Sequence, residues 1–378
     1  MVAMKKMLIA LLVTASVFFT LVFTLGTVGR NKGDEFKVAM VTDFSDVNDG
    51  SFNQACYEGA KEWSRRHNVT FNYYKPASIS PAERIKSMRL AIDRGYNVIL
   101  CPGFALGEPI SIVAPEHPNV QFIGLDISGL QKIDNVTVYN YQEEIAGYLA
   151  GYAAVKEGFR NLGFLGGQEY EAITRYGYGY IQGADAAAKE LEEPIKIDFV
   201  YGGQFFGSPE IHNYIDQWYK SGTEIVFSCG GSIYTSAALA AKENGGYMIG
   251  VDDDQAPIVD RDYKPGVCIT SAMKMIKKTV IDKLELCYQG IPLEGDTVKL
   301  GLVSGDNVEE NYVQLPLSTW EKYDDVHPRM KNFTYEDYKD IVGYLFNNPT
   351  AVSSDIHYKP DQVPVSEYTN VIAHDPIN

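Results

Sequence analysis

The chain has 378 residues, of which 45% are hydrophobic and 22% are charged, and its formal net charge is −16. This length exceeds one ordinary core and fits two lobes, and the composition excludes a disordered or collagen-like chain. The negative charge argues against nucleic acid as a partner, because phosphate binding needs clustered Lys and Arg side chains.

The first predicted element is an apolar segment that follows Lys5 and Lys6 and runs to Val28. It is long enough to span a bilayer as a helix, and it also has the pattern of an export signal. The sequence slightly favours a retained anchor over a cleaved signal. We assign residues 1–33 to this signal or anchor segment and expect the rest of the chain on the extracytoplasmic face of the cell membrane.

From residue 36 onward, short β-branched runs alternate with longer helical patterns, which is typical of repeated βαβ units. The expected strands are 37–42, 70–74, 98–102, 121–125, 136–139, 161–165, 195–200, 225–228, 247–251 and 267–270. Parallel strands need helices on both faces of their sheet, and these strands are too many for one sheet. We therefore expect two helix–sheet–helix lobes.

Further strands are expected at 296–303 and 312–317, and a closing helix at 334–347 is expected to be capped by Thr334 with Asp337. The interruptions of the pattern predict lobe one at 36–139 plus 266–292 and lobe two at 140–265 plus 293–347. Residues 348–378 show no period and are expected to form an extended or poorly ordered tail.

Two predicted strands run directly into aspartates, at Asp43 and at Asp252. The carboxyl ends of parallel strands face the crevice where ligands bind, so these carboxylates are placed to accept hydrogen bonds. For either aspartate alone, capping of the next helix is an equally good interpretation. The five cysteines have no C-x-x-C spacing, which favours small buried side chains over disulfides or a zinc site.

An enzyme that uses a nucleotide is the first rival interpretation. The chain contains no G-x-G-x-x-G, phosphate-loop, His-Glu-x-x-His or G-x-S-x-G motif, and its six histidines are scattered. We therefore expect no catalytic activity, no cofactor and no metal site.

Four segments together resemble the basic membrane protein family of ABC-transporter substrate-binding proteins, which is typified by purine nucleoside-binding lipoproteins. The segments are Asp49-Gly50-Ser51-Phe52-Asn53-Gln54, Gly163-Phe164-Leu165-Gly166-Gly167, Ile249-Gly250-Val251-Asp252-Asp253-Asp254-Gln255 and Thr270-Ser271-Ala272-Met273-Lys274. The resemblance covers residues 36–346. It implies an α/β fold of the type I periplasmic-binding-protein kind, in which two Rossmann-like lobes joined by a three-strand hinge close on a nucleoside.

Matched residue by residue, the resemblance implies a ligand site in which Asp252 and Lys274 would hold the ribose. Gly230, at the end of a predicted strand, is added as a backbone N–H donor, and an ordinary glycine turn at the strand end is an equally good interpretation of it. The full set of expected ligand-binding residues is Asp43, Phe52, Asn53, Asp126, Phe205, Gly230, Asp252 and Lys274.

The other end of the expected site would bind the base. By the same match, Asp43 and Asp126 would read the edge of the base and Phe52 would stack on its face. A second aromatic plate is expected from Phe205 rather than from its neighbour Phe206.

The resemblance implies a nucleoside ligand, ABC permease and ATPase subunits as partners, and membrane attachment through the N-terminal segment. Lipoprotein members carry a cysteine just after the signal, whereas no cysteine of this chain precedes Cys56, so cysteine-linked lipid attachment is not expected. The alternative function is a membrane-anchored sensor or regulatory protein that binds a nucleoside or sugar in the same closing cleft.

Overall fold

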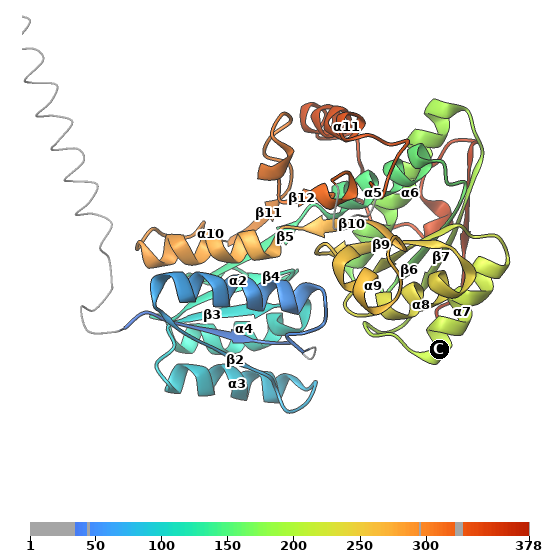
Figure 1. Ribbon diagram of the computed structural model, residues 1–378. Coiled ribbons are helices and arrows are strands. Elements are labelled where there is room, and N and C mark those ends of the chain that lie inside the picture. Colours follow the sequence, from blue (N-terminus) through green and yellow to red (C-terminus); the bar gives the residue numbers. More distant parts are fainter. Residues whose placement is uncertain (1–34, 44–45, 295, 322–327, 378) are drawn as a thin grey trace, which may run out of the picture.

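The computed structural model describes residues 35–43, 46–294, 296–321 and 328–377, which form two lobes side by side (Figure 1). The expected signal or anchor segment at 1–33 lies outside these residues. Among the helices that are described, none combines the length and the apolar character needed to cross a bilayer.

Lobe one is built on a six-stranded parallel sheet in the order β11-β5-β4-β3-β1-β2. Helices α2 and α10 cover one face and helices α3 and α4 cover the other. The strands are β1 (Lys37–Val41), β2 (Thr70–Tyr74), β3 (Val98–Pro102), β4 (Gln121–Leu125), β5 (Val136–Tyr141) and β11 (Asp296–Leu300). The helices are α2 (Phe52–His67), α3 (Pro81–Asp93), α4 (Gly107–Val113) and α10 (Ile276–Tyr288).

Lobe two is built on a seven-stranded sheet in the order β12-β10-β9-β8-β6-β7-β13, in which only the β10–β12 pair is antiparallel. Its strands are β6 (Asn161–Gly166), β7 (Ile195–Tyr201), β8 (Ile225–Cys229), β9 (Tyr247–Asp252), β10 (Cys268–Lys274), β12 (Val313–Gln314) and β13 (Thr369–Ala373). Its helices are α5 (Glu143–Glu157), α6 (Glu171–Leu191), α7 (Pro209–Lys220), α8 (Tyr234–Asn244), α9 (Ala256–Asp262) and α11 (Tyr335–Asn347).

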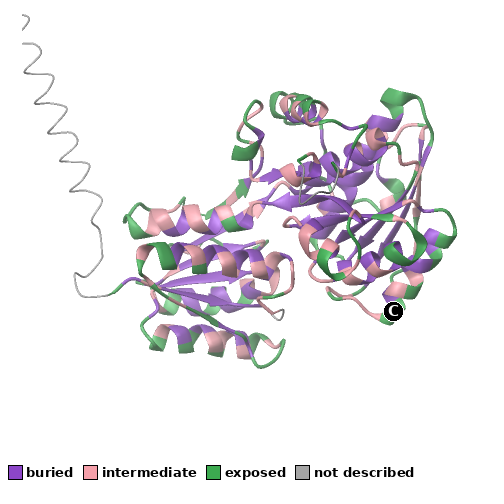
Figure 2. Cartoon of the chain, viewed as in Figure 1, coloured by how far each residue is buried: buried purple, intermediate pink, exposed green. Residues whose placement is uncertain are grey.

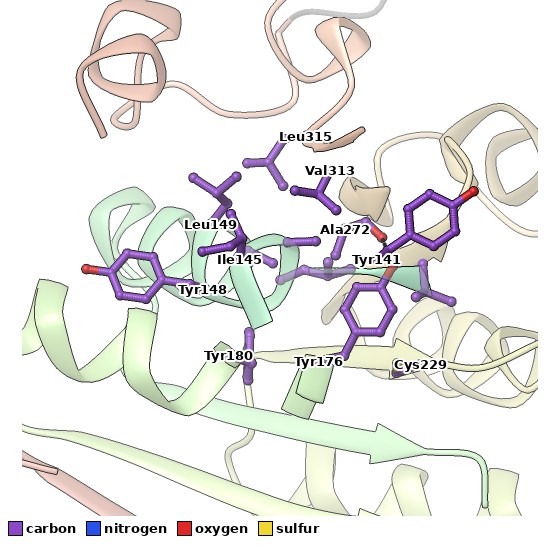
Figure 3. Close-up of a cluster of buried hydrophobic side chains, with 14 of the residues drawn as sticks. Tyr141, Ile145, Tyr148, Leu149, Tyr176, Tyr180, Cys229, Ala272, Val313 and Leu315 are labelled. Atoms are coloured by element: carbon purple, nitrogen blue, oxygen red, sulfur yellow. Dashed lines mark hydrogen bonds between the residues drawn. The ribbon is translucent and has the colours of Figure 1, made fainter. Parts of the chain in front are cut away.

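The cores follow from the alternation of side chains along the strands. Val98 and Leu100 of β3 join the cluster under α2, whereas Ile99 and Cys101 join the cluster under α3 and α4. Figure 2 shows the result, with buried strands between helices whose outer faces are exposed. In lobe two, α5 and α6 meet β10 and β12 in a cluster that includes Tyr176, whose hydroxyl donates to Ala272 O (Figure 3).

Most of the elements expected from the sequence are confirmed. The strands 70–74, 98–102 and 121–125 have the expected bounds, and Thr334 and Asp337 form the expected capping box of α11. All five cysteines are free thiols. The alternation of strands and helices along the sequence therefore predicted the α/β fold class correctly.

The pairing of the late strands differs from the expected lobe division. Segment 266–292 was expected wholly in lobe one, but β10 pairs with β9 in the second sheet and only α10 packs on α2. Segment 293–347 was expected wholly in lobe two, but β11 pairs with β5 in the first sheet. The chain thus passes between the lobes three times, after β5, after β10 and after β11. Which sheet a strand joins depends on partners distant in sequence, which local pattern does not encode.

The tail expected at 348–378 is also different, because part of it is a strand. Residues Thr369–Ala373 form β13, which pairs in parallel with the first five residues of β7, from Ile195 to Phe199. A strand of this length at a sheet edge carries little hydrophobic pattern of its own, since its stability comes from the neighbouring strand.

Candidate functional site

A cavity of about 320 Å³ lies between the lobes, at the carboxyl ends of the parallel strands. All eight residues expected from the sequence line it, so the structure brings the expected set together; that they contact a ligand stays a prediction. The lining residues are Asp43, Asp49, Phe52, Asn53, Gly103, Phe104, Asp126, Ser128, Tyr170, Glu171, Ala172, Ile173, Arg175, Phe205, Gly230, Gly231, Asp252 and Lys274.

Two of the aspartates have an unusual backbone conformation. Asp126 follows β4 with φ of 54° and Asp252 ends β9 with φ of 67°, in the left-handed region that residues other than glycine rarely adopt. Such strain persists only where the surrounding structure enforces it, and it concentrates at functional sites. Both carboxylates are held in the same cavity by this geometry.

A buried lysine joins three carboxylates at one end of the cavity. The Lys274 ammonium is paired with Asp126 Oδ2, lies 3.5 Å from Asp252 Oδ1 and lies 3.9 Å from Glu143 Oε1. It also sits 4.8 Å from the centre of the Phe52 ring. Burial opposes the charge on Lys274, but the carboxylates outweigh burial and raise the pKa of the ammonium above its usual value.

The same carboxylates that favour the charged form of Lys274 disfavour the charged form of Asp126. Burial raises the pKa of Asp126 to about 6, and the neighbouring Glu143 and Asp252 charges add to that rise against the effect of Lys274. One ammonium cannot neutralise three carboxylates, so repulsion among the carboxylates adds to the effect of burial on the pKa of Asp126. Arg175 compensates part of this charge, since its Nε donates to Glu143 Oε2 at 2.7 Å.

In the same cavity wall, Asn53 is fixed between two further carboxylates. Its Nδ2 donates to Asp43 Oδ1 at 3.4 Å and to Asp49 Oδ2 at 3.3 Å. Asp49 in turn accepts the backbone N–H groups of Ser51, Asn53 and Gln54, which anchors the start of α2. Burial raises the pKa of Asp49 to about 6 against the lowering effect of these hydrogen bonds.

Two buried acceptors in the cavity wall have no hydrogen-bond partner among the described residues, Asn53 Oδ1 and Asp126 Oδ1. The orientation of the Asn53 amide is set by the two carboxylates that face its nitrogen, so Oδ1 is the atom left for another donor. Because buried acceptors are nearly always satisfied, these two atoms indicate where a ligand would place hydroxyl or N–H groups.

Four aromatic rings line the cavity. Phe52 begins α2 in lobe one, and Phe205 lies in the loop after β7 in lobe two, whereas Phe206 is 56% exposed. Phe104 of lobe one and Tyr170 of lobe two stack with ring centres 3.7 Å apart, and Tyr170 is also nearly parallel to Phe205. The stacked rings of Phe104 and Tyr170 therefore form a contact between the lobes, next to the ring of Phe205.

Sequence reasoning missed Phe104, Tyr170 and Arg175. Phe104 follows β3 as Asp43 follows β1, so the rule that singled out Asp43 would have found it. Tyr170 follows β6 after a short loop, so the same rule would have found it. Arg175 lies inside α6, one turn from its start, and nothing in its local sequence marks it.

Direct hydrogen bonds between the lobes surround the cavity. Ser51 Oγ donates to Asp252 Oδ2 at 2.6 Å, and Ser128 Oγ donates to Glu171 Oε2 at 2.6 Å. Gln255 Nε2 donates to the carbonyl oxygen of Gly50 at 2.9 Å. This is a closed arrangement, in which lobe one and lobe two touch around the space that they enclose.

Comparison with solved structures confirms the fold class. The chain is similar to an ABC transporter solute-binding protein from Aeropyrum pernix K1, with a TM-score of 0.66 and 19% identity, over 87% of this chain and 90% of that one. At this identity the likeness concerns the fold alone, the two-lobed α/β fold of type I periplasmic-binding proteins.

Among curated proteins, the chain is 31% identical over 297 residues to the ABC transporter nucleoside-binding protein BmpA of Lactococcus lactis, covering 74% of this chain and 82% of that one. It is 24% identical over 285 residues to an uncharacterized lipoprotein of Pyrococcus abyssi, covering 73% of this chain and 69% of that one. A relative named a lipoprotein speaks against excluding lipid attachment from the missing cysteine, so we carry that exclusion no further.

The model of a protein family matches residues 36–326, which is most of the chain. That family is named Bmp and is described as ABC transporter substrate-binding protein, PnrA-like. The match spans the first sheet, every strand of the second sheet except β13, and every residue of the cavity wall. This chain belongs to the Bmp family of PnrA-like ABC transporter substrate-binding proteins.

Proposed function

We propose that the ligand which this substrate-binding protein delivers to its transporter is a nucleoside, bound between the lobes and not chemically altered. The observation that carries the proposal is the pair of unsatisfied buried acceptors, Asn53 Oδ1 and Asp126 Oδ1, in the wall of a cavity that aromatic rings also line. The name of the Lactococcus relative supports the same ligand class.

The polar groups of the cavity wall suit the two halves of a nucleoside. Ribose hydroxyls can donate to Asp252 and accept from Lys274, which is the role expected for a cation beside carboxylates. The family resemblance assigns Asp126 to the edge of the base, but because Asp126 is paired with Lys274 we propose that it accepts from a ribose hydroxyl instead. An N–H group of the base can donate to Asn53 Oδ1, and the faces of the base can pack on the Phe52 and Phe205 rings of the wall. The cavity volume lies at the lower end of the ~300–1,000 Å³ typical of small-molecule sites.

The charge of the wall favours an uncharged ligand over a phosphorylated one. Lys274 and Arg175 are the cations of the described wall, and both are already paired with carboxylates. A phosphate would meet an excess of negative charge without a free donor of opposite sign. The carboxylates of the wall are Asp43, Asp49, Asp126, Glu171 and Asp252.

The family assignment gives ABC permease and ATPase subunits as partners, which receive the ligand after the lobes open. We place the lobes on the extracytoplasmic face of the membrane, where a permease would meet them. The N-terminal segment that would attach the chain there lies outside the described residues.

The test is calorimetry of the purified protein with purine and pyrimidine nucleosides and with free ribose, preceded by mass spectrometry of any co-purified ligand. We expect Asp252→Ala to weaken nucleoside binding more than tenfold, because a hydrogen bond to a charged group contributes ~1.5–3 kcal/mol. The matched control is Asp253→Ala, which changes the next carboxylate outside the cavity wall and is expected to leave affinity unchanged. Equal affinity for ribose and nucleoside would contradict the proposal.

A further inference from the structure

The end of the chain forms a structure that the family match does not include. We call residues 369–377 the C-terminal strap; they consist of β13 and the extended residues after it. The family model ends at residue 326, so no part of the strap follows from it. The strap packs on lobe two along the outer edge of β7.

The approach to the strap is fixed along α6. Ser353 exchanges two hydrogen bonds with the Gln182 side chain, at 2.8 and 3.0 Å. Ser366 donates to Asp185 Oδ1 through both its backbone N–H and its hydroxyl, at 2.9 and 2.7 Å. These contacts fix where the segment before the strap reaches the edge of the sheet.

The strap then continues past the end of β13 to the end of β7. The His374 backbone N–H donates to Phe199 O at 2.9 Å, and the Ile377 backbone N–H donates to Tyr201 O at 2.9 Å. Tyr201 is the last residue of β7. The strap therefore holds the point at which the strand becomes the loop that carries Phe205.

Contacts on both sides restrain that loop. A side chain at Gly203, where φ is 74°, would lie 3.2 Å from Ile377 O, so the strap packs directly on the loop. On the other side, Phe205 O accepts the backbone N–H of Ser232 at 2.9 Å. The Phe205 ring lies so close to Gly230 that a Cβ there would meet it at 2.8 Å. The Phe205 ring thus packs between Gly167 after β6, where an added Cβ would meet it at 2.5 Å, and Gly230 after β8, while the strap contacts the loop at Gly203, two residues earlier.

We propose that the C-terminal strap is a positioning element of the ligand site, acting through Phe205. It pairs the edge of β7 and fixes the start of the loop, so that the Phe205 ring is ordered in the cavity before the ligand arrives. Such preorganisation lowers the entropy that binding would otherwise lose. The inference rests on the proposed function, since it concerns the affinity of the same cavity.

The experiment compares the full chain with a truncation after Ala373, which removes the bonds to Phe199 and Tyr201 and keeps β13. We expect the truncation to weaken nucleoside binding at least fivefold at a temperature where thermal unfolding shows both proteins to be folded. The matched control is Ser366→Ala, which removes one contact to α6 before the strap and is expected to leave affinity unchanged.

A double-mutant cycle with Phe205→Ala separates positioning from general destabilisation. If the strap acts through Phe205, truncation changes the affinity of the Phe205→Ala variant by less than twofold. Equal affinities of full-length and truncated protein, or additive effects in the cycle, would overturn the inference.

Hydrogen exchange provides a readout without ligand. The amides of residues 202–206 are expected to exchange faster in the truncated chain than in the full chain, and unchanged exchange would overturn the inference. If the wild-type protein binds no nucleoside, the proposed function fails, while the exchange measurement still decides on the strap.

Discussion

Asp126 combines strain, burial and an unsatisfied oxygen in one side chain. Its backbone lies in the left-handed region, its Oδ2 is paired with Lys274, and its Oδ1 has no partner among the described residues. Each of these features lowers the stability of the folded protein, so a residue whose only role was structural would not be expected to combine them. Their coincidence at one carboxylate is best explained by a ligand that donates a hydrogen bond to it.

Asp126 should also make ligand binding depend on pH. Its pKa of about 6 means that Asp126 takes up a proton between pH 7 and pH 5. The neutral acid is a weaker acceptor of a hydrogen bond from a ligand hydroxyl than the charged carboxylate is. The ligand favours the ionised form, so affinity is full above pH 7 and falls as the pH drops through 6. We expect binding at pH 5 to be about tenfold weaker than at pH 7, measured by calorimetry.

The control for this pH profile is Asp126→Asn, which is expected to bind weakly but with a flatter profile. A profile that survives in Asp126→Asn would assign the titration to another group such as Asp49, whose pKa burial also raises to about 6. A wild-type affinity that is constant from pH 7 to pH 5 would contradict the prediction.

The residues found from sequence are those that stand at strand ends or in the recognised segments. Asp43 and Asp252 could be predicted because the end of a parallel strand fixes where its next side chain lies, whereas Lys274 was predicted only from its match to a segment of the family. Glu143 and Arg175 could not, because they enter the site through helix positions whose direction depends on how α5 and α6 pack together.

The packing of α5 on α6 brings the backbones of the two helices into direct contact. A Cβ at Gly147 would lie 2.1 Å from Tyr176 O, and a Cβ at Gly183 would lie 2.0 Å from Tyr148 O. No side chain fits at these distances, so the backbones of the two helices touch. Because the starts of α5 and α6 carry Glu143 and Arg175, this seam sets the distance between those two side chains.

We expect Gly183→Ala to lower the free energy of unfolding by about 1–3 kcal/mol or more, because overpacking against a backbone atom forces the helices apart. The measurement is chemical denaturation. The matched control is Gly343→Ala in α11, another helical glycine, where the nearest atom to an added Cβ is Gly305 O at an ordinary 3.5 Å. That variant is expected to be neutral or up to ~1 kcal/mol more stable. Equal effects of the two substitutions would contradict the close seam.

Helices and strands were predicted well where their own sequence pattern defines them, and poorly where their pairing depends on strands distant in the sequence. The strand β3 is a continuous run of buried residues between helices, and its bounds were found. By contrast, β10 is buried at every position and could pair in either sheet, and β13 depends on the edge that β7 offers. The lobe division was therefore misplaced at strands whose partners lie far away in the sequence.

At the scale of the whole molecule, the three crossings join two lobes that have separate sheets. Each sheet is covered by its own helices, so the lobes can move as rigid bodies about the crossings. The cavity wall contains residues of both lobes, and the hydrogen bonds around it exist only in the closed arrangement. A bound ligand that contacts both lobes would therefore stabilise closure.

The contribution of the bonds between lobes can be measured with two serine substitutions. Ser51 is fully buried, and its hydroxyl bonds Asp252 rather than capping α2, so Ser51→Ala removes a bond between lobes without weakening the helix. Ser128 is exposed and its bond to Glu171 can be replaced by water.

We expect Ser51→Ala to speed ligand dissociation about tenfold in stopped-flow measurements, as the loss of a buried bond to a charged group implies. Association should change little, because the ligand meets the open form before this bond exists. Ser128→Ala is expected to change dissociation less than twofold. If both variants release ligand at the wild-type rate, closure is not held by these contacts; if Ser51→Ala slows association instead, the bond forms before the ligand binds and the order of events is reversed.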